Sequence, residues 1–186
     1  IFQKYDFIII CTYGQTGNLF EKFPNYQKEY QYEVCEKIFV KLPPVFNDIS
    51  VLVMDGPFMG IDPIGDTGMF IIGDVVHTVH QRSVGKYPII DKKYKPFLNK
   101  GIIKNPSISK FKQFIESGIR FMPELKNAKY VGSSFCIKAT LPNVDKTDER
   151  HTIIEEINEK IMTVFSGKIP TCVEAAKTIE CILENK

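Results

Sequence analysis

The residues best placed to do chemistry follow a short apolar run near the carboxyl end of the chain. The segment Ile161–Thr171, IMTVFSGKIPT, predicts a buried strand, a Ser-Gly-Lys turn and a helix with Pro170 in its first turn. Such a turn leaves backbone N–H groups and the positive end of a helix dipole at the edge of a sheet. Gly167 would let a ligand approach the backbone closely. The pattern predicts a site for a phosphate or an electron-rich oxygen, with a purely structural turn as the alternative.

A histidine supplies the second candidate group. His77 and His80 lie three residues apart, and in a strand they would point to opposite faces, so they would not share a metal ion. An imidazole titrates near neutral pH, and His77 would therefore suit proton removal from an alcohol or an amine. The competing interpretation is a hydrogen-bonded strand histidine with no role in chemistry.

The elements that would position these groups follow from the apolar pattern. Short links between the apolar runs predict antiparallel pairing, with a hairpin turn at Asp55-Gly56. A helix capped by Ser107 and ended by Pro123 would cover the sheet. The expected fold class is α+β, a mostly antiparallel sheet with helices on one side. The predicted strands of this sheet are Tyr30–Leu42, Ile49–Met54, Phe58–Asp62, Met69–Arg82 and Tyr130–Leu141.

The two ends of the chain predict a different layer. Tyr5–Cys11 is a continuous apolar run, typical of a strand buried on both faces in a parallel sheet. Together with Ile161–Leu183 it has the pattern of a strand and a strand–helix unit from a nucleotide-binding sheet. The chain also starts at Ile1 rather than Met, and we expect it to be part of a longer protein.

Val164–Thr171, followed by Ala175-Ala176-Lys177, resembles the carboxy-terminal signature of the D-amino-acid oxidase superfamily of FAD-dependent oxidoreductases, which includes glycerol-3-phosphate dehydrogenases and glycine oxidases. The dehydrogenase branch has a Gly-Gly-Lys turn and a Thr, where this chain has Ser166-Gly167-Lys168 and Thr171. The resemblance implies that the amides of this turn face the pyrimidine edge of the flavin and stabilise negative charge there. It also implies that Lys168 neutralises reduced flavin or holds the substrate.

Two more segments are similar to parts of this superfamily. Tyr5–Gly14 resembles the strand that lies against FAD, which implies cofactor contacts for Thr12, Tyr13 and Gly14, with one extra residue before the glycine. The loop Leu141–Thr152 resembles one in which Arg150 falls at an active-site arginine. An ion pair of Arg150 with Asp145 or Asp148 is the competing interpretation. The glycerol-phosphate branch has Arg-Pro where this chain has Leu141-Pro142, which argues against glycerol 3-phosphate as the substrate.

The resemblance covers essentially the whole chain and implies the carboxy-terminal part of an FAD-dependent oxidoreductase. That enzyme would oxidise a C–H bond next to an amine or hydroxyl of a small molecule. Residues 1–20 and 142–186 would be remnants of a Rossmann-like FAD-binding domain, and 21–141 the substrate-binding sheet. The glycine-rich unit that holds the pyrophosphate is absent, so an amino-terminal FAD-binding half is an expected partner.

The expected catalytic residues are Lys168, Arg150 and His77, and the expected cofactor contacts are Thr12, Tyr13, Gly14, Ser166, Gly167, Lys168 and Thr171. The alternative is a non-enzymatic α+β binding module.

Composition narrows the remaining possibilities. The 24 Lys and Arg against 22 Asp and Glu give a net charge of +2, without a basic stripe interleaved with aromatics, so nucleic acid is not an expected partner. The apolar runs are too short for a membrane span. No Cys-x-x-Cys pair exists, and no metal site is expected. The five cysteines are predicted to be buried and reduced, which favours a cytoplasmic protein.

Overall fold

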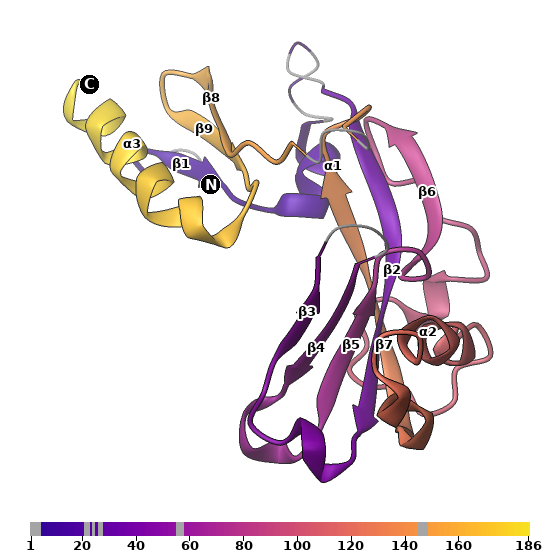
Figure 1. The fold of residues 1–186 in the computed structure, drawn as a ribbon. Coiled ribbons are helices and arrows are strands. Elements are labelled where there is room, and N and C mark those ends of the chain that lie inside the picture. The colour runs from indigo at the N-terminus through magenta and orange to yellow at the C-terminus, as the bar shows by residue number, and fades with distance from the viewer. Residues whose placement is uncertain (1–4, 21–22, 24, 26–27, 55–57, 145–148) are drawn as a thin grey trace. The chain divides into compact units, whose positions relative to one another are not determined.

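A computed structural model of the chain describes residues 5–20, 23, 25, 28–54, 58–144 and 149–186. The chain divides into two compact units, each described here by itself (Figure 1). Unit 1 consists of Ile1–Tyr32, Ser83–Ile89 and Lys138–Lys186. Unit 2 consists of Glu33–Arg82 and Ile90–Ile137. The predicted division into an FAD-binding part, residues 1–20 and 142–186, and a substrate-binding part, residues 21–141, stays a prediction.

A six-stranded sheet forms the frame of unit 2, in the order β3-β4-β5-β2-β6, with β7 also paired to β2. The pairs β3/β4, β4/β5 and β2/β5 are antiparallel, which confirms the mainly antiparallel α+β fold. The predicted hairpin between β3 and β4 is present, but its Asp55-Gly56 turn lies outside the described residues. The strands are β2 (Tyr30–Lys41), β3 (Val51–Val53), β4 (Met59–Pro63), β5 (Phe70–Asp74), β6 (Val79–Gly85) and β7 (Lys129–Thr140).

One face of this sheet carries the core of unit 2. Alternate residues of a strand point to the same face, so Ile38 of β2 meets Ile72 of β5, and Ile72 meets Ile61 of β4; all three are fully buried. The helix α2 (Phe111–Gly118) packs on this face and inserts Phe114, which is fully buried. Figure 1 shows α2 lying against the sheet.

Three predictions about unit 2 are wrong in detail. The helix begins at Phe111 rather than Ser107, because the Ser109 hydroxyl accepts the Phe111 N–H at 3.2 Å before the helix starts. The strand at Ile49–Met54 is an edge strand with Leu52 65% exposed, not a buried one. The segment Met69–Arg82 is broken by a turn after Asp74 into β5 and β6, and β6 pairs with β2.

Unit 1 contains a separate three-stranded sheet in the order β1-β9-β8, so the two ends of the chain form a layer of their own, as predicted. β1 (Ile8–Ile10) and β9 (Ile161–Phe165) are parallel, and β8 (Ile153–Asn158) is antiparallel to β9. The predicted burial of the first strand on both faces is wrong, because Ile9 is 41% exposed. β8 was not predicted at all.

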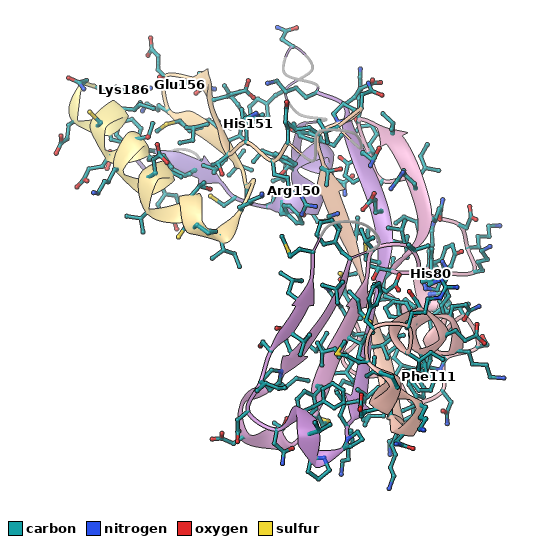
Figure 2. All side chains as sticks on the ribbon, in the orientation of Figure 1. His80, Phe111, Arg150, His151, Glu156 and Lys186 are labelled. Carbon is teal, nitrogen blue, oxygen red and sulfur yellow. The ribbon has the colours of Figure 1, made fainter. Side chains whose placement is uncertain are left out.

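Helices complete unit 1. The short α1 (Thr16–Phe20) follows β1, and α3 (Cys172–Glu184) follows β9. Lys186 pairs with Glu156 of β8 and thereby fixes the end of α3 to the sheet (Figure 2). Short 3-10 turns lie at Tyr13–Gln15, Pro44–Phe46, Gly65–Thr67, Lys95–Phe97, Pro123–Asn127 and Ile169–Thr171.

The cysteines differ from the prediction. Cys35 is buried, but Cys11, Cys136, Cys172 and Cys181 are exposed. The argument for a reducing compartment from buried thiols is therefore wrong, and the cytoplasmic location stays a prediction without it. No helix in the described parts of the chain has the length and apolar content needed to cross a bilayer.

Candidate cofactor and substrate site

The parallel pairing of β1 with β9 creates the candidate site in unit 1. Ile8 pairs with Ile161 and Ile10 with Thr163, so the two strands end at the same edge of the sheet. The segments that follow them carry most of the predicted cofactor contacts. The rings of Tyr13 and Phe165 are stacked with their centroids 6.1 Å apart, which places the two segments side by side.

The loop after β1 offers an aromatic surface at this edge. Tyr13 has a positive φ of 47°, and its ring is 39% exposed. Behind it, Phe165 is buried and stacks at 4.6 Å on Tyr30. Gly14 is buried, and the hydroxyls of Thr12 and Thr16 are hydrogen-bonded at 3.1 Å. The loop therefore presents one flat ring to its surroundings and keeps its glycine inside.

A chain of hydrogen bonds holds the Ser-Gly-Lys turn after β9. The Gly167 N–H donates to the Thr152 hydroxyl at 3.0 Å, and the Thr152 and Thr171 hydroxyls are 2.5 Å apart. Thr171 donates to the Lys168 carbonyl at 2.7 Å, so Thr152 must donate to Thr171. Each hydroxyl proton has one acceptor in this arrangement. Thr171 thus stabilises the turn through its side chain.

Gly167 is required by the protein's own backbone. A Cβ at this position would lie 1.9 Å from the carbonyl oxygen of Arg150, far inside any contact distance. Gly167 therefore does allow another group to approach its backbone closely, as predicted, but that group is the Arg150 loop and not a ligand. This observation, with the engaged N–H of Gly167, favours the structural interpretation of that residue.

The backbone N–H groups left at the turn belong to Lys168 and Ile169. Neither has a hydrogen-bond acceptor among the described residues, and they precede the first turn of α3. Ile169 is 86% exposed, and the Lys168 side chain is exposed as well. The edge thus combines unused donors, a helix amino end and a cation, which fit an electron-rich ring edge or an anion.

The other two predicted catalytic residues lie in different surroundings. Arg150 is half-buried in unit 1 and touches the turn through its carbonyl, while Asp145 and Asp148 of the competing interpretation lie outside the described residues. His77 belongs to unit 2. It lies in the turn between β5 and β6, where Asp74 Oδ1 accepts its backbone N–H at 2.8 Å, and not in a strand as predicted.

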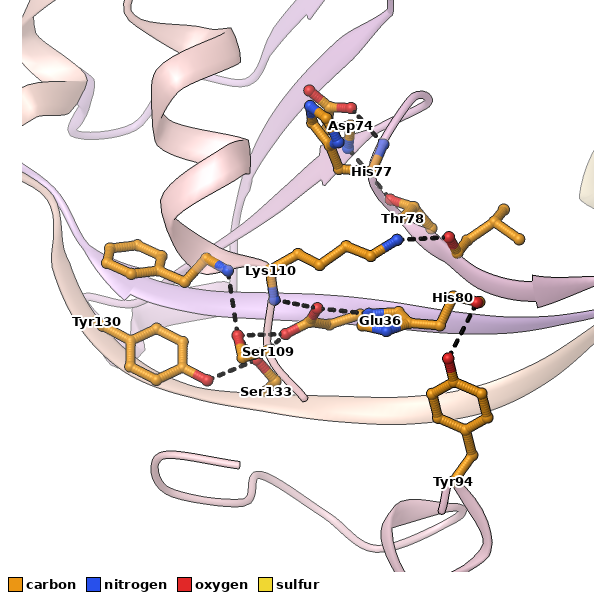
Figure 3. Close-up of polar contacts among 12 residues, drawn as sticks. Glu36, Asp74, His77, Thr78, His80, Tyr94, Ser109, Lys110, Tyr130 and Ser133 are labelled. Carbon is orange, nitrogen blue, oxygen red and sulfur yellow. Dashed lines mark hydrogen bonds and ion pairs between the residues drawn. The ribbon is translucent and has the colours of Figure 1, made fainter. Parts of the chain in front are cut away.

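Sequence reasoning missed a buried carboxylate in unit 2 (Figure 3). Glu36 of β2 is fully buried and accepts four hydrogen bonds. Its Oε1 accepts from the hydroxyls of Ser109 at 2.6 Å and Ser133 at 2.5 Å. Its Oε2 accepts from His80 Nε2 at 2.8 Å and from the Lys110 N–H at 2.9 Å. The cluster cross-links β2, β6, β7 and the start of α2.

The surroundings of this cluster explain its chemistry. Burial alone would raise the pKa of Glu36, but the hydrogen bonds from His80, Ser109, Ser133 and the Lys110 N–H outweigh burial and hold the pKa below its ordinary value. A carboxylate with all its lone pairs engaged and a low pKa is a poor general base. We therefore assign Glu36 a structural role. The signal in the sequence was a Glu on the apolar face shared by Tyr32, Val34 and Ile38.

Two depressions of the described surface are lined by none of the predicted site residues. One, of about 470 Å³, is in unit 2, and the other, of about 620 Å³, is in unit 1 at the amino ends of β1 and β9. The described residues contain no group of three or more side chains suited to hold a metal ion. The first depression is lined by Asn105, Pro106, Ser109, Phe111, Lys112, Gln113, Glu116 and Tyr130, and the second by Tyr5, Asp6, Ile8, Phe23, Asn158, Glu159, Lys160 and Ile161.

Comparison with known proteins gives a likeness in structure but not in sequence. No family model matches the chain, and no curated protein matches its sequence. Glycine oxidase from Geobacillus kaustophilus superposes with a TM-score of 0.59 and 11% identity, over 97% of this chain and 42% of its own. Iminodiacetate oxidase from Chelativorans sp. BNC1 superposes with a TM-score of 0.53 and 12% identity, over 87% and 37%. The chain shares the fold of part of these oxidases.

The extent of these matches shows how much of each oxidase the chain corresponds to. It spans less than half of the length of either oxidase, yet nearly all of it is matched by the first. The matched portion therefore includes residues of both units, with the antiparallel sheet and the three-stranded sheet. At such low identity the likeness concerns the fold, and it carries no residue role from either protein.

Proposed function

We propose that this chain is the carboxy-terminal portion of an FAD-dependent oxidoreductase that oxidises a C–H bond next to an amine or hydroxyl of a small molecule. The observation that carries the proposal is the common edge at which β1 and β9 end, where the Tyr13 ring stacks on Phe165 and the Lys168 turn leads from β9 into α3. The shared fold with two oxidases supports it. FAD, when bound, supplies the electron chemistry.

The residues of the edge have separate roles in this proposal. The N–H groups of Lys168 and Ile169 meet the electron-rich edge of the flavin ring, and the Lys168 ammonium favours negative charge there. The exposed ring of Tyr13 covers part of a ring face. Arg150 binds an anionic group of the substrate, and His77 takes the proton that leaves the amine or hydroxyl. Ser166, Gly167 and Thr171 hold the turn in position.

The rest of the site belongs to an amino-terminal FAD-binding half. A glycine-rich strand–helix unit there would hold the pyrophosphate at a helix amino end. In this proposal residues 1–20 and 142–186 belong to that domain, and residues 21–141 form the substrate-binding sheet.

The isolated 186-residue chain is expected to bind FAD weakly. Only the contacts at the flavin edge are present, since the sequence contains no glycine-rich pyrophosphate unit. Gel filtration of the purified chain with excess FAD, followed by absorbance of the protein peak, tests this. A protein peak that stays yellow would contradict the expected division of the site, whereas co-expression with the amino-terminal half should restore bound flavin.

Replacing Lys168 by Met in the full-length protein is expected to slow flavin reduction by about one to two decades while FAD stays bound. Loss of a charge-assisted contact costs about 1.5–3 kcal/mol, and this charge acts where the transition state becomes negative. Stopped-flow reduction at several substrate concentrations measures the effect. Arg150→Met should instead weaken substrate binding more than it slows reduction at saturation.

Lys177→Met is the matched control, because Lys177 is an exposed lysine of α3 beyond the turn. Its flavin should be reduced at the unmodified rate. An unmodified rate in the Lys168→Met protein as well would show that the turn is structural and would remove the proposed role of Lys168.

A second function is favoured by the hydrogen bonds of the turn. Because Gly167 accommodates the Arg150 carbonyl and donates to Thr152, the turn is fully explained without a ligand at Gly167. A non-enzymatic α+β binding module would have the same turn. The coding sequence upstream of Ile1 distinguishes the two functions: a β-Gly-x-Gly-x-x-Gly-α unit with an acidic residue about 20 positions further on supports the oxidoreductase, and its absence supports the module.

A further inference from the structure

Charge is strongly segregated along unit 2. The segment Ile90–Ile137 contains ten Lys and Arg and only three Asp and Glu. The segment Glu33–Arg82 has the opposite balance, with three basic and seven acidic residues. A net charge of +2 for the whole chain therefore conceals a basic portion and an acidic one.

Nine of the ten cations of the basic segment are exposed. They belong to the stretch of unit 2 from Lys92 to Lys129, which contains α2, the turns before and after it and the start of β7, and which we call the basic layer. None of the nine forms an ion pair within the described residues. Lys93 Nζ lies 4.8 Å from the centroid of the Tyr94 ring, and the other eight charges are directed at the surroundings. The nine are Lys92, Lys93, Lys95, Lys100, Lys104, Lys112, Arg120, Lys126 and Lys129.

The tenth cation has an internal role that separates it from the layer. Lys110 is half-buried, and its ammonium donates to the Val79 carbonyl at 2.7 Å. Burial lowers the pKa of Lys110, while the neighbouring Glu36 carboxylate opposes that change.

Large apolar side chains are exposed among these cations. Ile119 and Phe121 flank Arg120 and are 38% and 42% exposed. Ile102 lies between Lys100 and Lys104 and is 40% exposed. Exposed apolar side chains next to these cations can contribute hydrophobic contacts with a binding partner, in addition to the attraction of the charges.

We propose that the basic layer binds an anionic lipid surface. Eight of the nine cations are lysines, whose flexible point charges suit a fluid array of head groups better than fixed paired contacts. The apolar side chains add the second signal that stable attachment to a bilayer needs. Nucleic acid is less well matched, because among the described residues of the layer only one arginine and one aromatic residue, Phe121, are exposed. The inference is independent of FAD and of the proposed reaction.

Vesicle flotation tests the proposal, because lipid-bound protein rises with the vesicles while aggregated protein sinks. The 186-residue chain should float with vesicles of phosphatidylcholine mixed with phosphatidylglycerol and should stay behind with phosphatidylcholine alone. Added salt should weaken binding because it screens the charges. The triple variant Lys95→Gln, Lys100→Gln, Lys104→Gln should bind about 100-fold more weakly, since each basic residue near an anionic surface contributes about fivefold.

The matched control removes three exposed lysines outside the layer, Lys37→Gln, Lys41→Gln and Lys177→Gln, and so changes net charge equally. Its binding should stay close to that of the unmodified chain. Phe121→Ser should weaken binding at low and at high salt alike. Equal losses in the two triple variants would overturn the proposal, as would failure to float with phosphatidylglycerol. Stronger binding to double-stranded DNA or to polyglutamate than to these vesicles would also overturn it.

Discussion

Replacing Glu36 by Gln is expected to lower the free energy of unfolding of unit 2 by about 3–5 kcal/mol. The carboxylate is fully buried and accepts from two hydroxyls, one imidazole and one backbone N–H. The Gln amide has one oxygen for these donors, and its NH₂ group would face the others. Because the donors come from β6, β7 and the start of α2, the loss loosens three connections at once.

Hydrogen exchange of the β2, β6 and β7 amides and thermal melting measure this effect. Glu116→Gln is the matched control, since Glu116 is exposed on α2 and its replacement should change stability by less than about 0.5 kcal/mol. Similar melting of the two variants would show that the cluster is not the main connection of unit 2.

The same substitution should remove part of the acid sensitivity of the chain. Because the folded pKa of Glu36 lies below the ordinary value of 4.5, its contribution is fully present above that pH and is lost as the pH falls through the folded pKa. The unmodified protein and the Gln variant should therefore converge in stability as the pH falls from 4.5 through the folded pKa of Glu36. Melting curves between neutral and acidic pH measure the difference. A constant gap down to the acid limit would contradict the low pKa.

The sequence predicted the elements whose pattern is local. The sequence of β2 alternates loosely between apolar and polar residues, which predicted the strand, although burial alternates only in its last five residues. The sequence predicted that the two ends of the chain form a separate layer, but the parallel pairing of β1 with β9, about 150 residues apart, was not itself predicted. β8 was missed because Ile153–Asn158 mixes charged and apolar residues without a strand pattern, and only its pairing with β9 makes it a strand.

The candidate site shows a different limit. The resemblance implied cofactor contacts for Tyr13 and Lys168, which stay a prediction, and nothing in the sequence predicted that Thr152 and the Arg150 backbone would complete the turn. The Glu36 cluster could not be predicted for a similar reason, because its members are far apart in the sequence. A Glu within an apolar strand indicates a buried carboxylate, yet its donors Ser109 and Ser133 are 73 and 97 residues away.

Replacing Gly167 by Ala is expected to destabilise unit 1 by about 2–4 kcal/mol. The new Cβ would lie 1.9 Å from the Arg150 carbonyl oxygen, which is backbone and has no rotamer to change. Relief of such a clash costs about 1–3 kcal/mol, and loss of the Gly167 N–H bond to Thr152 adds about 1 kcal/mol. Hydrogen exchange of the β9 amides reports the loss locally.

Two further variants separate the contributions at this turn. Gly85→Ala is the matched control in unit 1, because its Cβ would meet only the Tyr87 carbonyl at an ordinary 3.8 Å. Thr152→Val removes the acceptor of the Gly167 N–H without adding a clash, and it should show only the smaller part of the effect. If Gly167→Ala leaves β9 as protected as Gly85→Ala does, the Arg150 loop moves freely away from the turn. The turn would then be open to a ligand, and the structural interpretation of Gly167 would be wrong.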